Sequence, residues 1–134
     1  MTLDSAELVP VAPELFVPDV GEAVRFYTGQ LGFETKIVKP EGEPDRRTAF
    51  AVVALGPARV LLAHEALYGE PLAGPRGLGV DIRFMVKDVD AVYGRVRAAR
   101  LKIVREIGDR DYGLRDFIVA DLNGFRLRFA APLR

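Results

Sequence analysis

The chain has 134 residues, 49% of them hydrophobic, and this length predicts one compact domain with its own core. It contains no cysteine and one histidine, which excludes thiolate nucleophiles, disulfides, cysteine-ligated zinc and any single-chain metal site with two histidines. Its 19 basic and 19 acidic residues cancel, which argues against nucleic acid as a partner, but residues 1–65 carry −4 (6 basic, 10 acidic) and residues 66–134 carry +4 (13 basic, 9 acidic).

A strand followed by a helix opens the first repeat. Residues 12–20, APELFVPDV, alternate like a strand and run into Val-x-Asp-Val. Asp19 is a good N-cap with Glu22 three residues on, a capping box, and Gly32 stops the helix. The apolar stripe recurs at helical spacing: Val20, Val24, Tyr27 and Leu31.

Three strand-like runs follow this helix, at residues 33–38, 47–55 and 58–65, with a Pro/Gly/Glu loop at 40–45. Residues 66–79 are predicted to be a linker, because four glycines and two prolines fall between positions 68 and 79.

The same pattern begins again at an offset of 69 residues. Residues 81–89, DIRFMVKDV, form the strand; Asp88 caps a helix whose stripe is Val89, Val92, Tyr93 and Val96. Strand-like runs follow at 101–106, 115–121 and 125–130, the last two joined by the hairpin signal Asn123-Gly124. The chain is βαβββ written twice, at about 12–65 and 80–131, which predicts one α+β domain with helices outside a curved antiparallel sheet that forms a cup.

Strand alternation predicts the lining of this cup. Ala12, Glu14 and Phe16 point into it, while Leu15 and its neighbours face the helix; on later strands Val60, Leu62 and His64, Asp81, Arg83 and Met85, and Arg126, Arg128 and Ala130 also point inward. With Tyr112 added, the candidate ligand-binding residues are Glu14, Phe16, Leu62, His64, Asp81, Arg83, Met85, Tyr112, Arg126 and Arg128. A half-apolar concavity with a few charges is typical of a small-molecule site.

Several of these residues also have purely structural interpretations. His64 is interpreted either as a ligand contact or base, or as a structural residue at a strand end. For Arg126 and Arg128 the alternatives are an anion clamp, or side chains that are solvated or ion-paired with Glu14 and Asp81. For Tyr112 the alternatives are stacking on a planar ligand and packing in the fold. The basic stretch 95–105 is interpreted as an exposed helix face. The sequence contains no glycine-rich phosphate-binding loop, no Ser/His/Asp order of a catalytic triad and no HExxH metal-binding pattern.

Three segments resemble the glyoxalase / bleomycin resistance protein / dioxygenase superfamily, also called vicinal oxygen chelate proteins: VPDVGEAVRFYTGQLGFE, VKDVDAVYGRV and DYGLRDFIVADLNGFRLRF. The resemblance covers residues 12–131 and is greatest to the bleomycin resistance type, whose aromatic-Gly-x-Arg-acid-Phe run is 112–117 here. The family's Asp-Pro-x-Gly-Asn turn is replaced by Asp-Leu-Asn-Gly-Phe at 121–125.

The resemblance implies metal-ligand positions at Ala12, Leu62, Asp81 and Arg128, of which only Asp81 can ligate. We therefore expect no metal, no cofactor and no catalytic residue, although His64 could be recruited across a dimer interface. The resemblance implies a homodimer whose cups combine the N-terminal half of one subunit with the C-terminal half of the other.

The resulting hypothesis is a protein that sequesters a small organic molecule, with a neutral or anionic planar ligand favoured over cationic bleomycin. A metal-dependent glyoxalase-like lyase or isomerase, a ring-cleaving dioxygenase and a pure interaction module are the alternatives. No apolar run is long enough to span a bilayer and MTLDSAELVP lacks the features of an export signal, so we expect a soluble, cytoplasmic protein without a membrane partner.

Overall fold

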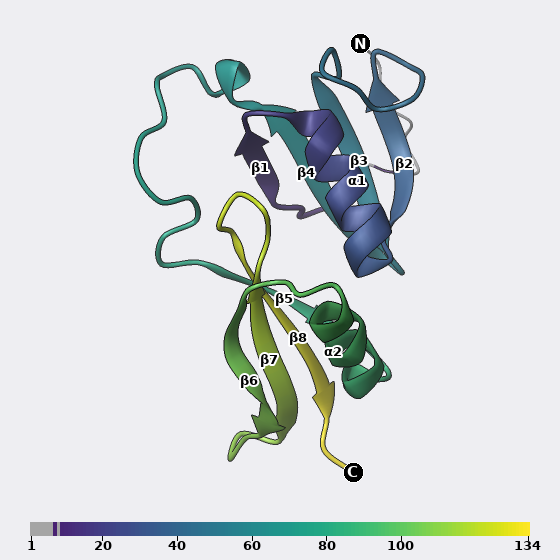
Figure 1. The fold of residues 1–134 in the computed structure, drawn as a ribbon, viewed down its shortest axis with the longest axis vertical. Helices are drawn as coiled ribbons and strands as arrows, with labels where there is room; N and C mark the ends of the chain where they lie inside the picture. The colour runs from purple at the N-terminus through teal and green to yellow at the C-terminus, as the bar shows by residue number, and fades with distance from the viewer. Residues whose placement is uncertain (1–6, 8) are drawn as a thin grey trace. The chain divides into compact units, whose positions relative to one another are not determined.

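Two βαβββ repeats make up the fold, as the sequence predicts (Figure 1). A computed structural model of the protein describes residue 7 and residues 9–134. The first repeat consists of β1 (Glu14–Val17), α1 (Val20–Leu31), β2 (Glu34–Lys39), β3 (Phe50–Leu55) and β4 (Ala58–His64), followed by the 3₁₀ helix η2 (Glu65–Tyr68). The second consists of β5 (Asp81–Met85), α2 (Val89–Ala98), β6 (Ile103–Asp109), β7 (Leu114–Ala120) and β8 (Arg126–Pro132).

Nearly all of the opening segment on which the export-signal expectation rests lies outside the described residues. No helix in the described part of the chain is long and apolar enough to cross a membrane.

Both helices begin at the predicted caps. The carboxylate of Asp19 accepts a hydrogen bond from the backbone N–H of Glu22 at 2.9 Å, and that of Asp88 accepts one from Ala91 at 3.0 Å. These bonds satisfy backbone donors that have no partner within the helix. Helix α1 ends at Gly32, whose φ of 78° lies in the left-handed region that glycine adopts without strain.

Each repeat forms its own four-stranded sheet, in the orders β1-β4-β3-β2 and β5-β8-β7-β6. β1 runs parallel to β4 and β5 parallel to β8, whereas all other neighbours are antiparallel. The sheets are therefore mixed, where the sequence predicted antiparallel strands throughout. The parallel pairs arise because a helix crossover, unlike a hairpin, brings the chain back in the same direction.

The chain divides into two compact units, Met1–Ala73 and Gly74–Arg134, and the boundary falls inside the predicted linker. In each unit the helix covers one face of the sheet (Figure 1). In the first unit, Tyr27 of α1 is fully buried and packs edge-on against Phe33, with ring centroids 5.2 Å apart. In the second, the rings of Phe84 and Phe117 stack on that of Phe129 at 5.3 and 5.5 Å. Helix and sheet thus enclose an apolar core in both units, which leaves the other face of each sheet to carry a site.

The turn between β7 and β8 forms at Asn123-Gly124, as predicted. The buried carboxylate of Asp121 accepts hydrogen bonds from the backbone N–H groups of Asn123 and Phe125 at 2.8 and 3.0 Å, and Gly124 takes a φ of 91°. This turn fixes the register of β7 and β8, which carry three charged residues of the site, Asp116, Arg126 and Arg128.

Candidate functional site

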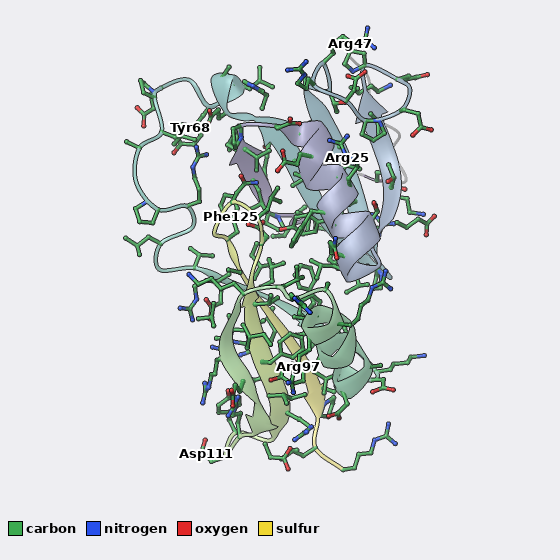
Figure 2. All side chains as sticks on the ribbon, viewed as in Figure 1. Arg25, Arg47, Tyr68, Arg97, Asp111 and Phe125 are labelled. Atoms are coloured by element: carbon green, nitrogen blue, oxygen red, sulfur yellow. The ribbon has the colours of Figure 1, made fainter. Side chains whose placement is uncertain are left out.

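We call the sheet face opposite the helix the open face of each unit. In the first unit the register pairs Glu14 with Leu61 and Phe16 with Ala63, so these side chains share the open face. Phe16 and Leu61 pack on a buried apolar cluster of Ile37, Phe50, Val52 and Ala63. Tyr68, labelled in Figure 2, lies edge-on to Phe16 with ring centroids 5.0 Å apart. The open face of the first unit therefore has an apolar centre, and charged residues, Glu14 among them, lie toward its edges.

The predicted inward positions on β4 are wrong by one residue. Leu62 pairs with the buried Leu15 on the helix-facing side and is itself fully buried, and Val60 shares that side. The inward positions belong instead to Leu61 and Ala63. The phase of this strand could not be read from alternation because β4, ARVLLAH, is apolar on both faces.

His64 has a structural role in the first unit. It ends β4, and its Nδ1 accepts a hydrogen bond from the backbone N–H of Ala66 at 3.0 Å, capping η2. By register it pairs with the buried Val17 rather than with an open-face residue. Of the two interpretations of His64, the structure supports the cap at the end of the strand.

The open face of the second unit brings together the charged residues predicted for it. β5 and β8 pair Asp81 with Arg126, Arg83 with Arg128 and Met85 with Ala130. A hollow of about 660 Å³ lies over this face, within the range of small-molecule sites. Its lining residues are Asp81, Arg83, Arg105, Tyr112, Leu114 and Arg128.

A buried carboxylate anchors this hollow. The side chain of Asp116 is 0% exposed and accepts hydrogen bonds from Arg110 Nε and Tyr112 Oη, both at 2.7 Å, and from Arg128 Nη1 at 2.9 Å. Burial by itself would raise the pKa of Asp116, but the hydrogen bonds from Arg110, Tyr112 and Arg128 outweigh it and lower the pKa below the usual value. The carboxylate is therefore ionised at neutral pH and fixes three side chains.

Arg128 also bonds a second carboxylate. Its Nη2 lies 3.0 Å from Asp81, which accepts a further hydrogen bond from Arg126 Nε at 2.6 Å. The hydrogen bond from Arg126, together with that from Arg128, lowers the pKa of Asp81 despite partial burial. Arg126 and Arg128 are thus ion-paired with Asp81, one of the partners foreseen for them. Arg128 bridges two carboxylates and is held rigidly across the face.

Three residues at or beside this hollow were missing from the predicted site. Arg105 lies on β6, within the strand predicted at 101–106, but it had been grouped with the exposed basic stretch 95–105 and not with the site; Arg110 follows that strand. Asp116 was quoted only as part of a family motif. The signal for it was its place in LRDFIVA of β7, because a charged residue inside a buried apolar strand needs charged partners.

The residues at the implied metal positions do not fit a divalent cation. Ala12 offers no donor, Leu62 lies on the opposite side of its sheet, and Arg128 carries a positive charge. The remaining ligand, Asp81, already bonds two guanidinium groups. Within residue 7 and residues 9–134, no group of three or more His, Asp or Glu side chains could hold a metal ion.

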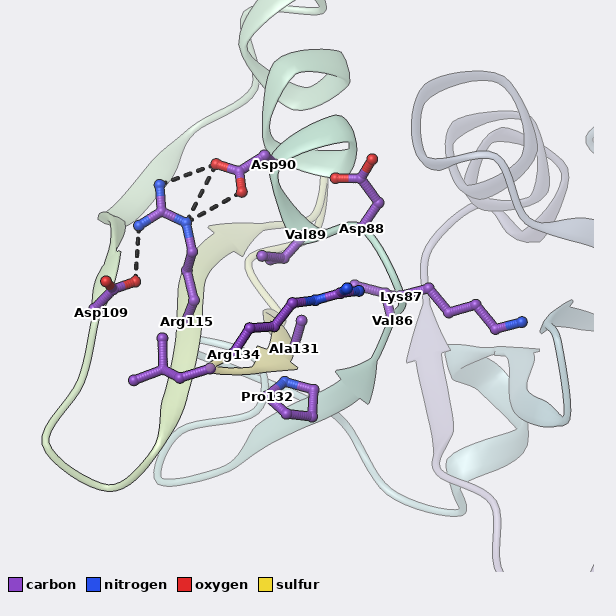
Figure 3. Close-up of a pocket in the computed structure, with 11 residues that line it drawn as sticks. Val86, Lys87, Asp88, Val89, Asp90, Asp109, Arg115, Ala131, Pro132 and Arg134 are labelled. Atoms are coloured by element: carbon purple, nitrogen blue, oxygen red, sulfur yellow. Dashed lines mark hydrogen bonds and ion pairs between the residues drawn. The ribbon is translucent and has the colours of Figure 1, made fainter.

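A second hollow, of about 850 Å³, lies where α2 begins, near the end of the chain (Figure 3). There Arg115 spans Asp90 on α2 and Asp109 on β6, with one nitrogen 2.9 Å from each carboxylate. The hydrogen bonds that Arg115 donates to Asp90 and Asp109 raise the pKa of Arg115 above its usual value. This arrangement ties helix to sheet, and none of the predicted ligand-binding residues lines it.

Comparisons with known proteins agree on one family. A family model described as the Glyoxalase/Bleomycin resistance protein/Dioxygenase superfamily matches residues 7–129. The solved structure of TioX from Micromonospora sp. ML1 is 26% identical, covers 94% of this chain and 98% of its own, and has a TM-score of 0.74.

Two further structures share the fold. A glyoxalase/bleomycin resistance protein/dioxygenase from Nocardioides is 22% identical over 99% of this chain and 87% of its own, with a TM-score of 0.71. A glyoxalase/bleomycin resistance protein/dioxygenase family enzyme from Burkholderia phytofirmans PsJN is 15% identical and covers 91% of this chain and 97% of its own, with a TM-score of 0.71. A search of curated proteins found no match.

Proposed function

Because the chain belongs to the Glyoxalase/Bleomycin resistance protein/Dioxygenase superfamily, we propose that it is a metal-free member that reversibly binds and sequesters a small organic molecule. The observation that carries this proposal is the hollow of the second unit, where rigid hydrogen-bond donors replace a metal-ligand set. Catalysis by a metal-dependent lyase or ring-cleaving dioxygenase would need about three protein ligands and an open position, which these residues do not provide.

The hollow combines fixed polar groups with apolar surface. Tyr112 is 50% exposed while its hydroxyl is bonded to Asp116, so its ring is held in place at the hollow and remains partly accessible. Leu114 lines the same hollow, and Met85, 53% exposed, lies on the same sheet face. A planar organic molecule can contact the ring and the aliphatic groups while polar atoms engage the guanidinium groups, and preorganised donors reduce the entropy cost of binding.

The proposal includes a homodimer in which each cup combines the N-terminal half of one subunit with the C-terminal half of its mate. The charges of −4 and +4 on the two halves support it, since they favour attraction between unlike halves. The two open faces are also complementary in character, one with an apolar centre and one charged. A ligand between them would meet an apolar wall and a polar wall.

Native mass spectrometry of freshly purified protein tests the proposal, because one spectrum reports the oligomer, any metal and any retained ligand. We expect a dimer with a bound organic mass that is lost in Arg128→Gln and retained in Arg115→Gln. Arg115 is the matched control because it also bridges two carboxylates, but at the other hollow. Stoichiometric Ni, Mn, Fe or Zn, lost together with an enzymatic activity on chelation, would overturn the proposal.

A further inference from the structure

We propose that the hollow of the second unit recognises an anionic group on a planar ligand, a carboxylate, sulfonate or phosphate, through Arg83 and Arg105. This inference rests on the proposed function and names the class of ligand that the site would take. It is drawn from the charge balance, the positions of the two arginines in the sheet and the fixed aromatic ring beside them.

The charges on this face do not balance. Five guanidinium groups belong to the open face and its rim, against two carboxylates, Asp81 and Asp116; the arginines are Arg83, Arg105, Arg110, Arg126 and Arg128. The carboxylates bond Arg110, Arg126 and Arg128. Among the described residues, the guanidinium groups of Arg83 and Arg105 have no hydrogen-bond or ion-pair partner. Three guanidinium groups thus share two carboxylates, and the two remaining guanidinium groups, which line the same hollow, have no counter-ion among the described residues.

The sheet register places these two arginines at opposite sides of one cross-strand row. The row runs from Arg83 on β5 through Arg128 on β8 and Ile118 on β7 to Arg105 on β6. Neighbouring strands are about 4.8 Å apart, so the two backbones lie roughly 14 Å from each other. Because a guanidinium stands several ångströms from its backbone, the two groups can approach a bound molecule from both sides.

The placement of Arg83 has an electrostatic cost without a ligand. It lies directly beside Arg128 on the neighbouring strand, and like charges in such a cross-strand pair are destabilising. Asp81 and Asp116 form ion pairs with Arg128, but no carboxylate of the described residues forms an ion pair with Arg83. A bound anion would relieve this repulsion and would form charge-assisted, bidentate hydrogen bonds with the guanidinium.

The fixed ring of Tyr112 favours a planar molecule. Its hydroxyl is bonded to the buried Asp116 at 2.7 Å, and Arg128 Nη1 lies 3.4 Å from the same oxygen. The ring therefore lines the hollow in a defined position together with Arg83 and Arg105. Aromatic ligands stack on such rings and on guanidinium planes alike.

Two fluorescent probes that differ by a sulfonate test the inference: 8-anilinonaphthalene-1-sulfonate and the neutral N-phenyl-1-naphthylamine. We expect the intact protein to bind the sulfonate at least tenfold more tightly. Arg83→Gln and Arg105→Gln should each weaken sulfonate binding by about tenfold, the usual effect of losing a hydrogen bond to a charged group, and leave the neutral probe unaffected. Arg83→Lys, which keeps the charge but loses the planar fork, should show an intermediate loss.

Lys102→Gln is the matched control, because it removes one exposed positive charge just before β6 and outside the hollow. It should change sulfonate affinity less than twofold. Equal binding of both probes, with no effect of either arginine substitution, would overturn the anion inference and leave the proposed function standing. Failure of both probes to bind, together with a native mass spectrum free of any organic ligand, would overturn both.

Discussion

Replacing Asp116 by Asn tests whether the buried carboxylate holds the site together. The side chain is 0% exposed and bonds Arg110 and Arg128, whose side chains are only 15% and 16% exposed, as well as Tyr112. Asn keeps the shape of the side chain but removes its negative charge. The N–H₂ group of its amide would also face donor groups of Arg110, Tyr112 and Arg128. Breaking a buried ion pair by changing one partner costs about 3–5 kcal/mol. Because both guanidinium groups keep some contact with water, we expect a loss of about 3 kcal/mol.

The loss should depend on pH in a defined direction. The pKa of Asp116 is lower in the folded protein than its usual value of about 3.9. The carboxylate therefore stabilises the fold at pH above the unfolded pKa, and this contribution disappears as the pH falls through the folded pKa. The difference in stability between wild type and Asp116→Asn should be greatest at pH 7 and should shrink below about pH 4.

Urea unfolding followed by circular dichroism measures both effects. Asp90→Asn is the matched control, since Asp90 also pairs with an arginine but its side chain is 62% exposed, and such surface pairs contribute little to stability. If Asp116→Asn and Asp90→Asn lose the same stability within about 0.5 kcal/mol at pH 7, the network does not anchor the site and the reasoning is refuted.

Three other outcomes are expected. Gly21→Ala should lose at least about 2 kcal/mol in urea unfolding, because its Cβ would lie within 3 Å of the Asp45 backbone, whereas Gly29→Ala, in open space on the same helix, should gain about 0.5–1 kcal/mol. Leu62→Ala should cost about 2–5 kcal/mol and Met85→Ala under about 0.5 kcal/mol; similar losses would contradict the corrected register. The proposed dimer should dissociate more readily as salt rises, and sedimentation that is unchanged between low and molar salt would show that the charge division is incidental.

The sequence predicted the parts of the fold that carry a strong local signal. Asp19 and Asp88 mark both helix starts because capping depends on residues within one turn. The positions on β5 and β8 were also predicted correctly, because charged and apolar residues alternate along them. The inward-facing positions on β4 were predicted wrongly because its apolar residues occupy both faces. Which residues face inward is set only by the pairing of β4 with β1 and β3.

The network around Asp116 required the three-dimensional fold. Its partners come from different places in the chain, Arg110 and Tyr112 from the loop between β6 and β7 and Arg128 from β8. No spacing in the sequence reports that these side chains converge, since two strand registers and the loop conformation decide it. A buried charge in a strand therefore indicates that partners exist without identifying them.

The role of Asp81 follows from the charges around it. The family resemblance assigns this position to a metal ligand, and a carboxylate is present, yet Arg126 and Arg128 occupy its oxygens. A divalent cation placed there would be repelled by both guanidinium groups. The arginines keep the face positive, as a metal would, but they offer directional hydrogen bonds and no vacant coordination position. Such a face offers directional hydrogen bonds but no metal to act as a Lewis acid, which is consistent with the sequestering function proposed above.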